Sequence, residues 1–116
     1  MVALEPELAP TLYRAREAGA PVDVAVGGIA ADSLGARRIG AIAREVSQRH
    51  VAQAMLLPDG AIRAAQLALW NDFKLAVEPA AALGLAALQT RAYLPQADEI
   101  VALVLCGANL DPATLA

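Results

Sequence analysis

The sequence predicts an α/β fold, a three-layer α/β sandwich in which helices cover a mostly parallel sheet. Composition is the first reason: 58% of the 116 residues are apolar but only 3% are aromatic. A core built from Ala, Leu, Val and Ile suits helices packed closely on a sheet. The second reason is the order strand, helix, strand, helix, strand, helix, helix, strand. Because no repeat or low-complexity linker interrupts it, we expect residues 1–116 to form a single α/β domain.

Short apolar runs are the expected strands. Val2-Ala3-Leu4 ends at Glu5-Pro6, where the residue before proline favours extended backbone. The run at 99–105 is continuously apolar, which is typical of a strand buried on both faces of a parallel sheet. A brief extended stretch is expected at 75–77. The remaining predicted strands are residues 22–26 and 51–57.

Helical spacing is clearest in residues 61–74. There Ile62, Ala65, Leu69 and Phe73 share one face, whereas Arg63, Gln66 and Lys74 lie off it. Asp59, in the preceding Pro-Asp-Gly turn, is a candidate N-cap. The other predicted helices are 10–18, 41–50 and 79–90, with a short helix inside the loop 29–40 and a last turn opened by Asp111-Pro112. Helix 79–90 begins at Pro79 and is apolar nearly all round, so it should be buried on several sides.

Charge and cysteine usage exclude several classes of protein. The net charge is −3 and the nine cationic residues are scattered, so we expect no nucleic-acid partner. A single cysteine, Cys106, rules out an internal disulfide framework and fits a reducing compartment, for which cytoplasmic is the default. The first residues lack the features of a signal peptide. The most apolar stretch, 75–88, is shorter than a bilayer span, so no membrane role is expected.

Four segments, taken together, resemble a known family. They are Leu4-Glu5-Pro6-Glu7-Leu8-Ala9-Pro10-Thr11, Ile29-Ala30-Ala31-Asp32-Ser33-Leu34, Val77-Glu78-Pro79-Ala80-Ala81-Ala82 and Val104-Leu105-Cys106-Gly107-Ala108-Asn109. In order and spacing they are similar to the second half of the pyridoxal-phosphate (PLP) dependent serine/threonine dehydratases, which include serine racemase. The resemblance implies part of the large domain of a fold-type II PLP enzyme with a tryptophan synthase β-like fold, and makes the chain a C-terminal fragment.

The resemblance also implies that the catalytic lysine lies elsewhere. In this family the first half supplies that lysine, in a Ser-x-Lys-x-Arg-Gly stretch, and a glycine-rich phosphate loop. Neither motif is present here, and Gly27-Gly28 is too short to be the loop. Lys74, the only lysine, stands in Trp70-Asn-Asp-Phe-Lys on the polar side of its helix. We therefore interpret it as a solvated surface residue, and expect no catalytic residue and no bound cofactor in this chain alone.

What the resemblance leaves here is the pyridine side of the cofactor pocket. Cys106 matches the position that places a neutral hydroxyl or thiol against the pyridine nitrogen; the alternative is a small buried hydrophobe at a strand end. Glu78 lies in the Glu-Pro segment that lines the cofactor pocket in the family. The alternative is that the helix dipole simply favours a carboxylate at the start of the following helix. Ser33 lies in the loop whose backbone approaches the cofactor ring, where it replaces the usual glycine.

A cation site is implied at Glu5, Ala9 and Thr11, where some members bind a divalent cation through two acids and a carbonyl. Oxygen ligands suit Mg²⁺ or Ca²⁺. Because Thr11 replaces the second acid, one charge is missing, which favours weaker binding or a monovalent cation. The alternative is an empty loop with Glu5 in solvent.

The function implied for the parent enzyme is dehydration and deamination of L-threonine or L-serine, a small-molecule amino-acid substrate, to a 2-oxo acid and ammonia. A fragment of an amino-acid racemase and a non-catalytic α/β binding module are the alternatives. A fragment of such an enzyme exposes the apolar face that normally packs against the rest of the protein. Because exposed apolar patches promote self-association, we also expect homo-oligomers.

Overall fold

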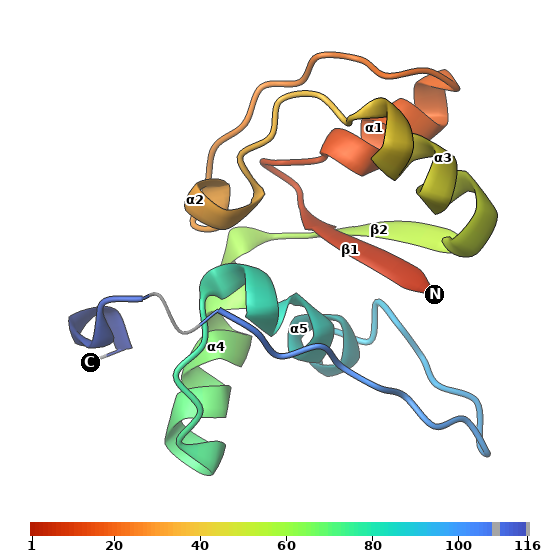
Figure 1. Ribbon diagram of the computed structural model, residues 1–116. Helices are drawn as coiled ribbons and strands as arrows, with labels where there is room; N and C mark the ends of the chain where they lie inside the picture. Colours follow the sequence, from red (N-terminus) through yellow and green to blue (C-terminus); the bar gives the residue numbers. More distant parts are fainter. Residues whose placement is uncertain (108–109, 116) are drawn as a thin grey trace.

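Two parallel strands form the middle layer of the structure, a computed structural model that describes residues 1–107 and 110–115 (Figure 1). Strand β1 (Val2–Pro6) pairs with β2 (Gln53–Leu57), so that Val2 lies opposite Gln53 and Pro6 opposite Leu57. Helices α1 (Thr11–Ala18) and α3 (Ala41–His50) occupy the connection between them, as parallel strands require a crossover. These bounds confirm the predicted first strand and both helices.

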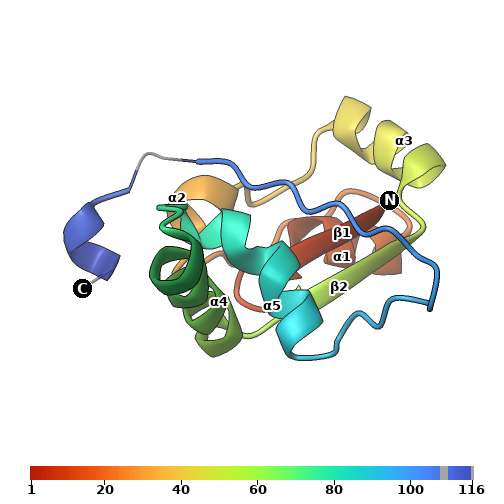
Figure 2. The same cartoon turned by 90° about the horizontal axis from the view of Figure 1, so that it is seen from below.

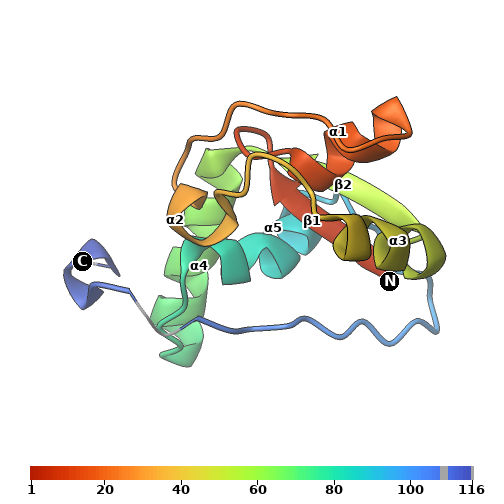
Figure 3. The same cartoon turned by 45° about the horizontal axis from the view of Figure 1, so that its top comes forward.

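The other layer consists of α4 (Asp59–Phe73) and α5 (Leu83–Gln89), on the side of the sheet opposite α1 (Figures 1 and 3). Short helices complete the chain: α2 (Ala31–Leu34), η1 (Pro79–Ala82) and η2 (Pro112–Leu115). Helices on both sides of a small parallel sheet confirm the three-layer α/β fold class. Within the described part of the chain, no helix combines the length and apolar character of a membrane span.

The main core lies between the sheet and the second helical layer. It joins Leu57 of β2 to Ile62 and Leu69 of α4, and to alanines of η1 and α5 that include Ala82 and Ala86. Alanine at these positions lets the helix backbones approach the sheet closely. The predicted burial of the helix begun by Pro79 is therefore confirmed, although its first turn is a 3₁₀ helix.

Two predicted strands are absent from the described residues. Residues 22–26 form an irregular segment, held by the Val24 N–H bonded to the Arg37 carbonyl and the Gly27 N–H bonded to the Leu8 carbonyl, both at 2.8 Å. Residues 99–105 run without a partner strand, and 75–77 has no regular structure. The strands predicted at 22–26 and 99–105 were wrong, because an apolar run becomes a strand only when a neighbour pairs with its backbone. Residues 75–77 were expected only as a brief extended stretch, and they lie outside the helices and strands.

Helix α4 departs from its prediction in three ways. It begins at Asp59, so Pro58 is the N-cap and the Asp59 carboxylate instead accepts the Ile29 N–H at 2.9 Å. Gln66, predicted off the apolar face, is 1% exposed, whereas Phe73, predicted on it, is 66% exposed. Gln66 is buried because its amide has internal hydrogen-bond partners, and Phe73 is exposed because it lies in the last turn, beyond the core.

Candidate functional site

Two of the predicted cofactor-binding residues are in direct contact. The Ser33 hydroxyl of α2 donates to Oε2 of Glu78 at 2.8 Å, although 45 residues separate them. The Glu78 N–H donates to the carbonyl of Gly107 at 2.9 Å, which brings in the residue after Cys106. Three segments far apart in sequence therefore meet at one point, called below the Ser33–Glu78–Gly107 junction.

Gly107 lets the Glu78 side chain lie directly against the backbone that follows Cys106. Its φ of +75° is in the left-handed region that favours glycine. A Cβ built on Gly107 would lie 2.6 Å from the Glu78 Cδ atom, closer than real atoms pack. The glycine at 107 is thus required by the close approach of the Glu78 carboxylate. Ala108 and Asn109, the end of the fourth family-like segment, lie outside the described residues.

Gln66 holds the residue that precedes Glu78. Its Nε2 donates to the Val77 carbonyl at 2.8 Å, and its Oε1 accepts from Nη1 of Arg63 at 2.8 Å. The buried amide therefore has both ends satisfied, which is what its burial requires. A signal was available in the sequence: Gln66 follows Ile62 by four positions and so occupies the i+4 place of the buried face.

A second polar contact fixes the loop that carries Ser33. The Asp59 carboxylate binds the Ile29 N–H, and Gly28 lies directly beneath it with a φ of +81°. A Cβ on Gly28 would meet the Asp59 Oδ2 at 2.6 Å. The start of α4 and the Gly27-Gly28 pair thus position α2 relative to Glu78, a role that the sequence interpretation had not assigned to Asp59.

Cys106 is exposed in this structure, and its contact with a pyridine nitrogen stays a prediction. Lys74 is exposed as well, and ends α4 in a left-handed conformation with φ +56°. Its ammonium donates to the Asn71 carbonyl of its own helix at 2.9 Å and lies 5.9 Å from the Trp70 ring centroid. This is the environment of a solvated surface lysine, as the sequence predicted.

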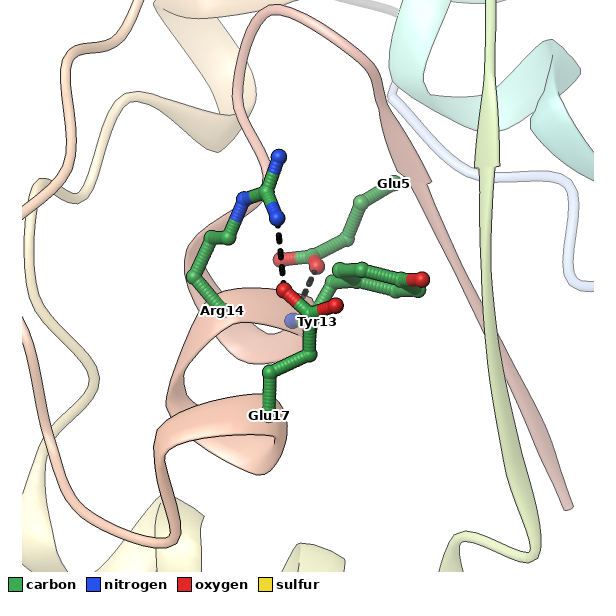
Figure 4. A network of polar contacts seen from close by, with 4 residues as sticks. All are labelled: Glu5, Tyr13, Arg14 and Glu17. Atoms are coloured by element: carbon green, nitrogen blue, oxygen red, sulfur yellow. Dashed lines mark hydrogen bonds and ion pairs between the residues drawn. The ribbon is translucent and has the colours of Figure 1, made fainter.

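The residues of the predicted cation site are engaged in other contacts. The Glu5 carboxylate accepts the N–H group of Leu12 at 2.8 Å. It also accepts the N–H group of Tyr13 at 2.7 Å, the contact drawn in Figure 4. It therefore caps α1, whose N-cap residue Pro10 makes no side-chain cap. The Thr11 hydroxyl donates to the Ala36 carbonyl, and Ala9 is buried.

The Glu5 side chain is therefore not in solvent, and both of its carboxylate oxygens already accept hydrogen bonds that would compete with a bound ion. Burial raises the pKa of its carboxyl above the usual value, against the opposing effect of the α1 amides. No cluster of three His, Cys, Asp or Glu side chains that could hold a metal occurs in residues 1–107 or 110–115. A cation at Glu5, Ala9 and Thr11 stays a prediction.

Chemically, the Ser33–Glu78–Gly107 junction offers a hydroxyl and a carboxylate, and Cys106, the residue before Gly107, is exposed. Such groups bind and orient a polar ring through hydrogen bonds. The free amine needed for covalent attachment of an aldehyde is not among them, because the one lysine is the solvated Lys74.

Comparison with known proteins identifies a family for this chain. The model of a family described as pyridoxal-phosphate dependent enzyme matches residues 1–107. Phenylserine dehydratase of Ralstonia pickettii is 36% identical over 116 residues, which are 100% of this chain and 36% of that protein. A biosynthetic L-threonine dehydratase of Pasteurella multocida is 32% identical over 99% of this chain and 23% of its own length. The chain thus spans about a third or less of these relatives.

Solved structures agree with the sequence relatives. A threonine deaminase from T.th. superposes with a TM-score of 0.83 and 31% identity, over 95% of this chain and 40% of that chain. An L-serine ammonia-lyase from Rhizomucor miehei gives a TM-score of 0.83 at 25% identity, over 98% of this chain and 38% of that one. Maize serine racemase gives 0.68 at 32% identity, over 74% of this chain and 27% of that one.

Proposed function

Because the chain belongs to the pyridoxal-phosphate dependent enzyme family, we propose that it supplies the pyridine-facing wall of a PLP site in a dehydratase of β-hydroxy amino acids. The observation that carries the proposal is the Ser33–Glu78–Gly107 junction. It joins three of the four family-like segments at one point, beside an exposed thiol.

The residues present fit the ring of PLP. The glycine at 107 lets the Glu78 carboxylate lie against the backbone next to Cys106, and Cys106 is exposed. Cys106 would form a hydrogen bond with the pyridine nitrogen, while Ser33 and Glu78 would border the ring. When bound, PLP supplies the electron-withdrawing group that stabilises negative charge at the substrate α-carbon. A neutral thiol would leave the ring nitrogen largely unprotonated, so the ring would withdraw electrons more weakly. This suits elimination, because the electron pair from the α-carbon leaves with the β-hydroxyl group.

The substrate class follows from what the relatives have in common. They are named for phenylserine and L-threonine, and a structural neighbour for L-serine, all amino acids with a β-hydroxyl. The proposed reaction is loss of that hydroxyl to give a 2-oxo acid and ammonia. Dehydration is favoured over racemisation because the threonine deaminase matches 95% of the chain with a TM-score of 0.83, against 74% and 0.68 for maize serine racemase.

The test uses Cys106, the only cysteine, as a reporter. Although no cofactor is expected to stay bound to the chain alone, we expect a large excess of 4′-deoxypyridoxine phosphate, a PLP analogue without the aldehyde, to slow the reaction of the Cys106 thiol with a disulfide reagent. A matched control carries Cys106→Ser together with Ala52→Cys, an exposed position directly before β2, where its N–H bonds to the Met1 carbonyl. Its thiol should react at the same rate with or without the analogue. Equal protection of both thiols, or of neither, would contradict a pyridine site at Cys106.

A second measurement tests whether the chain alone is catalytically silent. Mixed with PLP, it should develop no strong visible absorbance band, because its one lysine is solvated and bonded to the Asn71 carbonyl. A strong band that Lys74→Ala abolishes would show that Lys74 anchors the cofactor, and would overturn this part of the proposal.

A further inference from the structure

Two arginine side chains line a small pocket between α1 and α3. Arg16 belongs to α1 and Arg44 to α3, and the pocket has a volume of about 220 Å³. The other residues that line it are Leu12, Ala15, Gly19, Ser47 and Gln48. Both helices lie on the same side of the sheet (Figures 1 and 3), and in the view from below the strands pass in front of α1 (Figure 2). This feature is called the arginine pocket below.

Backbone carbonyls hold both guanidinium groups of the arginine pocket in place. Arg16 donates to three carbonyls at the C-terminal end of α3, and the shortest of these contacts is 3.0 Å, to Val51. Arg44 donates to the carbonyl of Gly19, the residue that ends α1. Each helix thus supplies an arginine that binds the end of the other. Because a carbonyl group has no net charge, both arginines stay positively charged.

Neither Arg16 nor Arg44 pairs with a carboxylate in the part of the chain that the structure describes. The ion pairs found there are Arg14 with Glu17, Arg38 with Asp23 and Arg49 with Glu45. Those three arginines are exposed, whereas Arg16 and Arg44 are half-buried, where an uncompensated charge is less favourable. Glu17 and Glu45 directly follow the two pocket arginines in sequence, yet they pair with exposed arginines of the same helices.

The two guanidinium groups also have unused hydrogen-bond donors. Arg44 uses only its Nη2 atom, so its Nε and Nη1 atoms have no acceptor among the described residues. The Nε atom of Arg16 has none there either. These N–H groups belong to a rigid planar fork that matches the oxygens of a carboxylate or a phosphate. No acidic side chain of the described residues lines the pocket to occupy them.

We propose that the arginine pocket binds a small oxyanion, a phosphate or carboxylate group, between Arg16 and Arg44. The oxygens of the anion would accept the unused N–H groups and compensate the two half-buried charges. The volume suits a small ion or metabolite, because it lies below the range of about 300–1,000 Å³ that is typical for drug-sized ligands. The proposal does not rest on the PLP site, with which the pocket shares no residue.

The test is a titration of the full 116-residue chain with sodium phosphate at neutral pH, followed through the backbone amide NMR signals. Sodium chloride keeps the ionic strength constant. We expect the amide signals of Gly19, Arg44 and Ser47 to shift until they saturate, while those of α4 stay fixed. A parallel titration with sodium acetate distinguishes the two kinds of oxyanion. Saturation by phosphate alone assigns the pocket to phosphate groups, and saturation by acetate assigns it to carboxylates as well.

Variants of Arg44 show whether its guanidinium group binds the anion. Arg44→Gln should weaken phosphate binding at least about tenfold, because hydrogen bonds to a charged group are lost. Arg49→Gln is the matched control: it removes the same charge from an exposed position of α3 and should leave the affinity unchanged. Arg44→Lys keeps the charge without the planar fork, so it should also bind more weakly than the unmodified chain. The amide spectrum of each variant shows whether it is folded, and Arg44→Lys decides the test if Arg44→Gln is not.

Three results would overturn the proposal. One is the absence of saturable shifts with both phosphate and acetate, or identical shifts when sodium chloride is added alone. Another is a folded Arg44 variant that binds phosphate as tightly as the unmodified chain. The third is equal weakening by Arg44→Gln and Arg49→Gln, because binding would then reflect the net charge of the chain and not the arginine pocket.

Discussion

Glu5 and Glu78 are the two carboxylates that the family resemblance singles out, and they are held in opposite ways. Both oxygens of Glu5 accept N–H groups from the first turn of α1, only seven and eight residues away. Glu78 accepts a hydroxyl from Ser33, 45 residues away, and its own N–H reaches Gly107. A carboxylate bonded to nearby backbone stabilises a local element, whereas one bonded across the fold belongs to a composite site. The predictions below test this difference.

The largest effect is expected from Glu5→Ala. Two amides of α1 would lose their partner, so the free energy of unfolding should fall by about 2 kcal/mol. Urea unfolding followed by circular dichroism measures it. Glu7→Ala is the matched control, because Glu7 is exposed and should change stability by less than about 0.5 kcal/mol. If both variants unfold at the same urea concentration, Glu5 does not anchor α1.

The next largest effect concerns the support of Glu78. Gln66→Leu would leave the Val77 carbonyl without its buried donor, and should lower the free energy of unfolding by about 1.5 kcal/mol. Gln48→Leu makes the same change on the exposed side of α3 and should be nearly neutral. A Gln66→Leu protein as stable as the Gln48→Leu protein would mean that the buried amide contributes nothing to holding the backbone at Glu78.

A smaller effect is expected from pH. Burial raises the pKa of Glu5 in the folded chain above its ordinary value of 4.5, so the folded state binds more protons than the unfolded state between these two pKa values. The contribution of Glu5 to stability is therefore greatest below the unfolded pKa and declines as pH rises through the folded one. The free energy of unfolding should be measured for the unmodified chain and for Glu5→Gln from acid to neutral pH. The difference between the two proteins should become smaller as the pH rises. A difference that grows with pH would contradict a raised pKa.

The smallest effect on stability is expected at the junction itself. The Ser33–Glu78 contact is exposed, so Ser33→Ala should change the free energy of unfolding by less than about 0.5 kcal/mol. Its consequence should be local, in the rate at which the Cys106 thiol reacts with a disulfide reagent. Thr114→Ala, at an exposed hydroxyl of η2, is the control for that rate. A loss of stability as large as that of Glu5→Ala would make Ser33 a structural residue rather than part of a site.

Much of the site was predictable because it rests on short motifs. Pro79 is favoured in the first turn of a helix, and Glu78 before it is extended, as a residue preceding proline should be. Asp59 and Gln66 were missed as supports because their partners, the Ile29 N–H and the Val77 carbonyl, are backbone groups that carry no side-chain signature. The contact of Ser33 with Glu78 could be expected only through the family resemblance.

The sequence by itself determined the local elements of this protein, such as α3 at residues 41–50 and the proline-led start of η1, because helix hydrogen bonds and caps lie within a few residues. Only the tertiary structure decided which apolar runs are strands and which polar residues are buried. Residues 2–6 and 53–57 pair with each other, while 99–105, as apolar as either, does not. A strand forms only when a neighbouring strand pairs with its backbone, and the residues of one run do not determine whether that neighbour exists. Similarly, Gln66 is buried by tertiary contacts that the spacing of apolar residues in its helix does not predict.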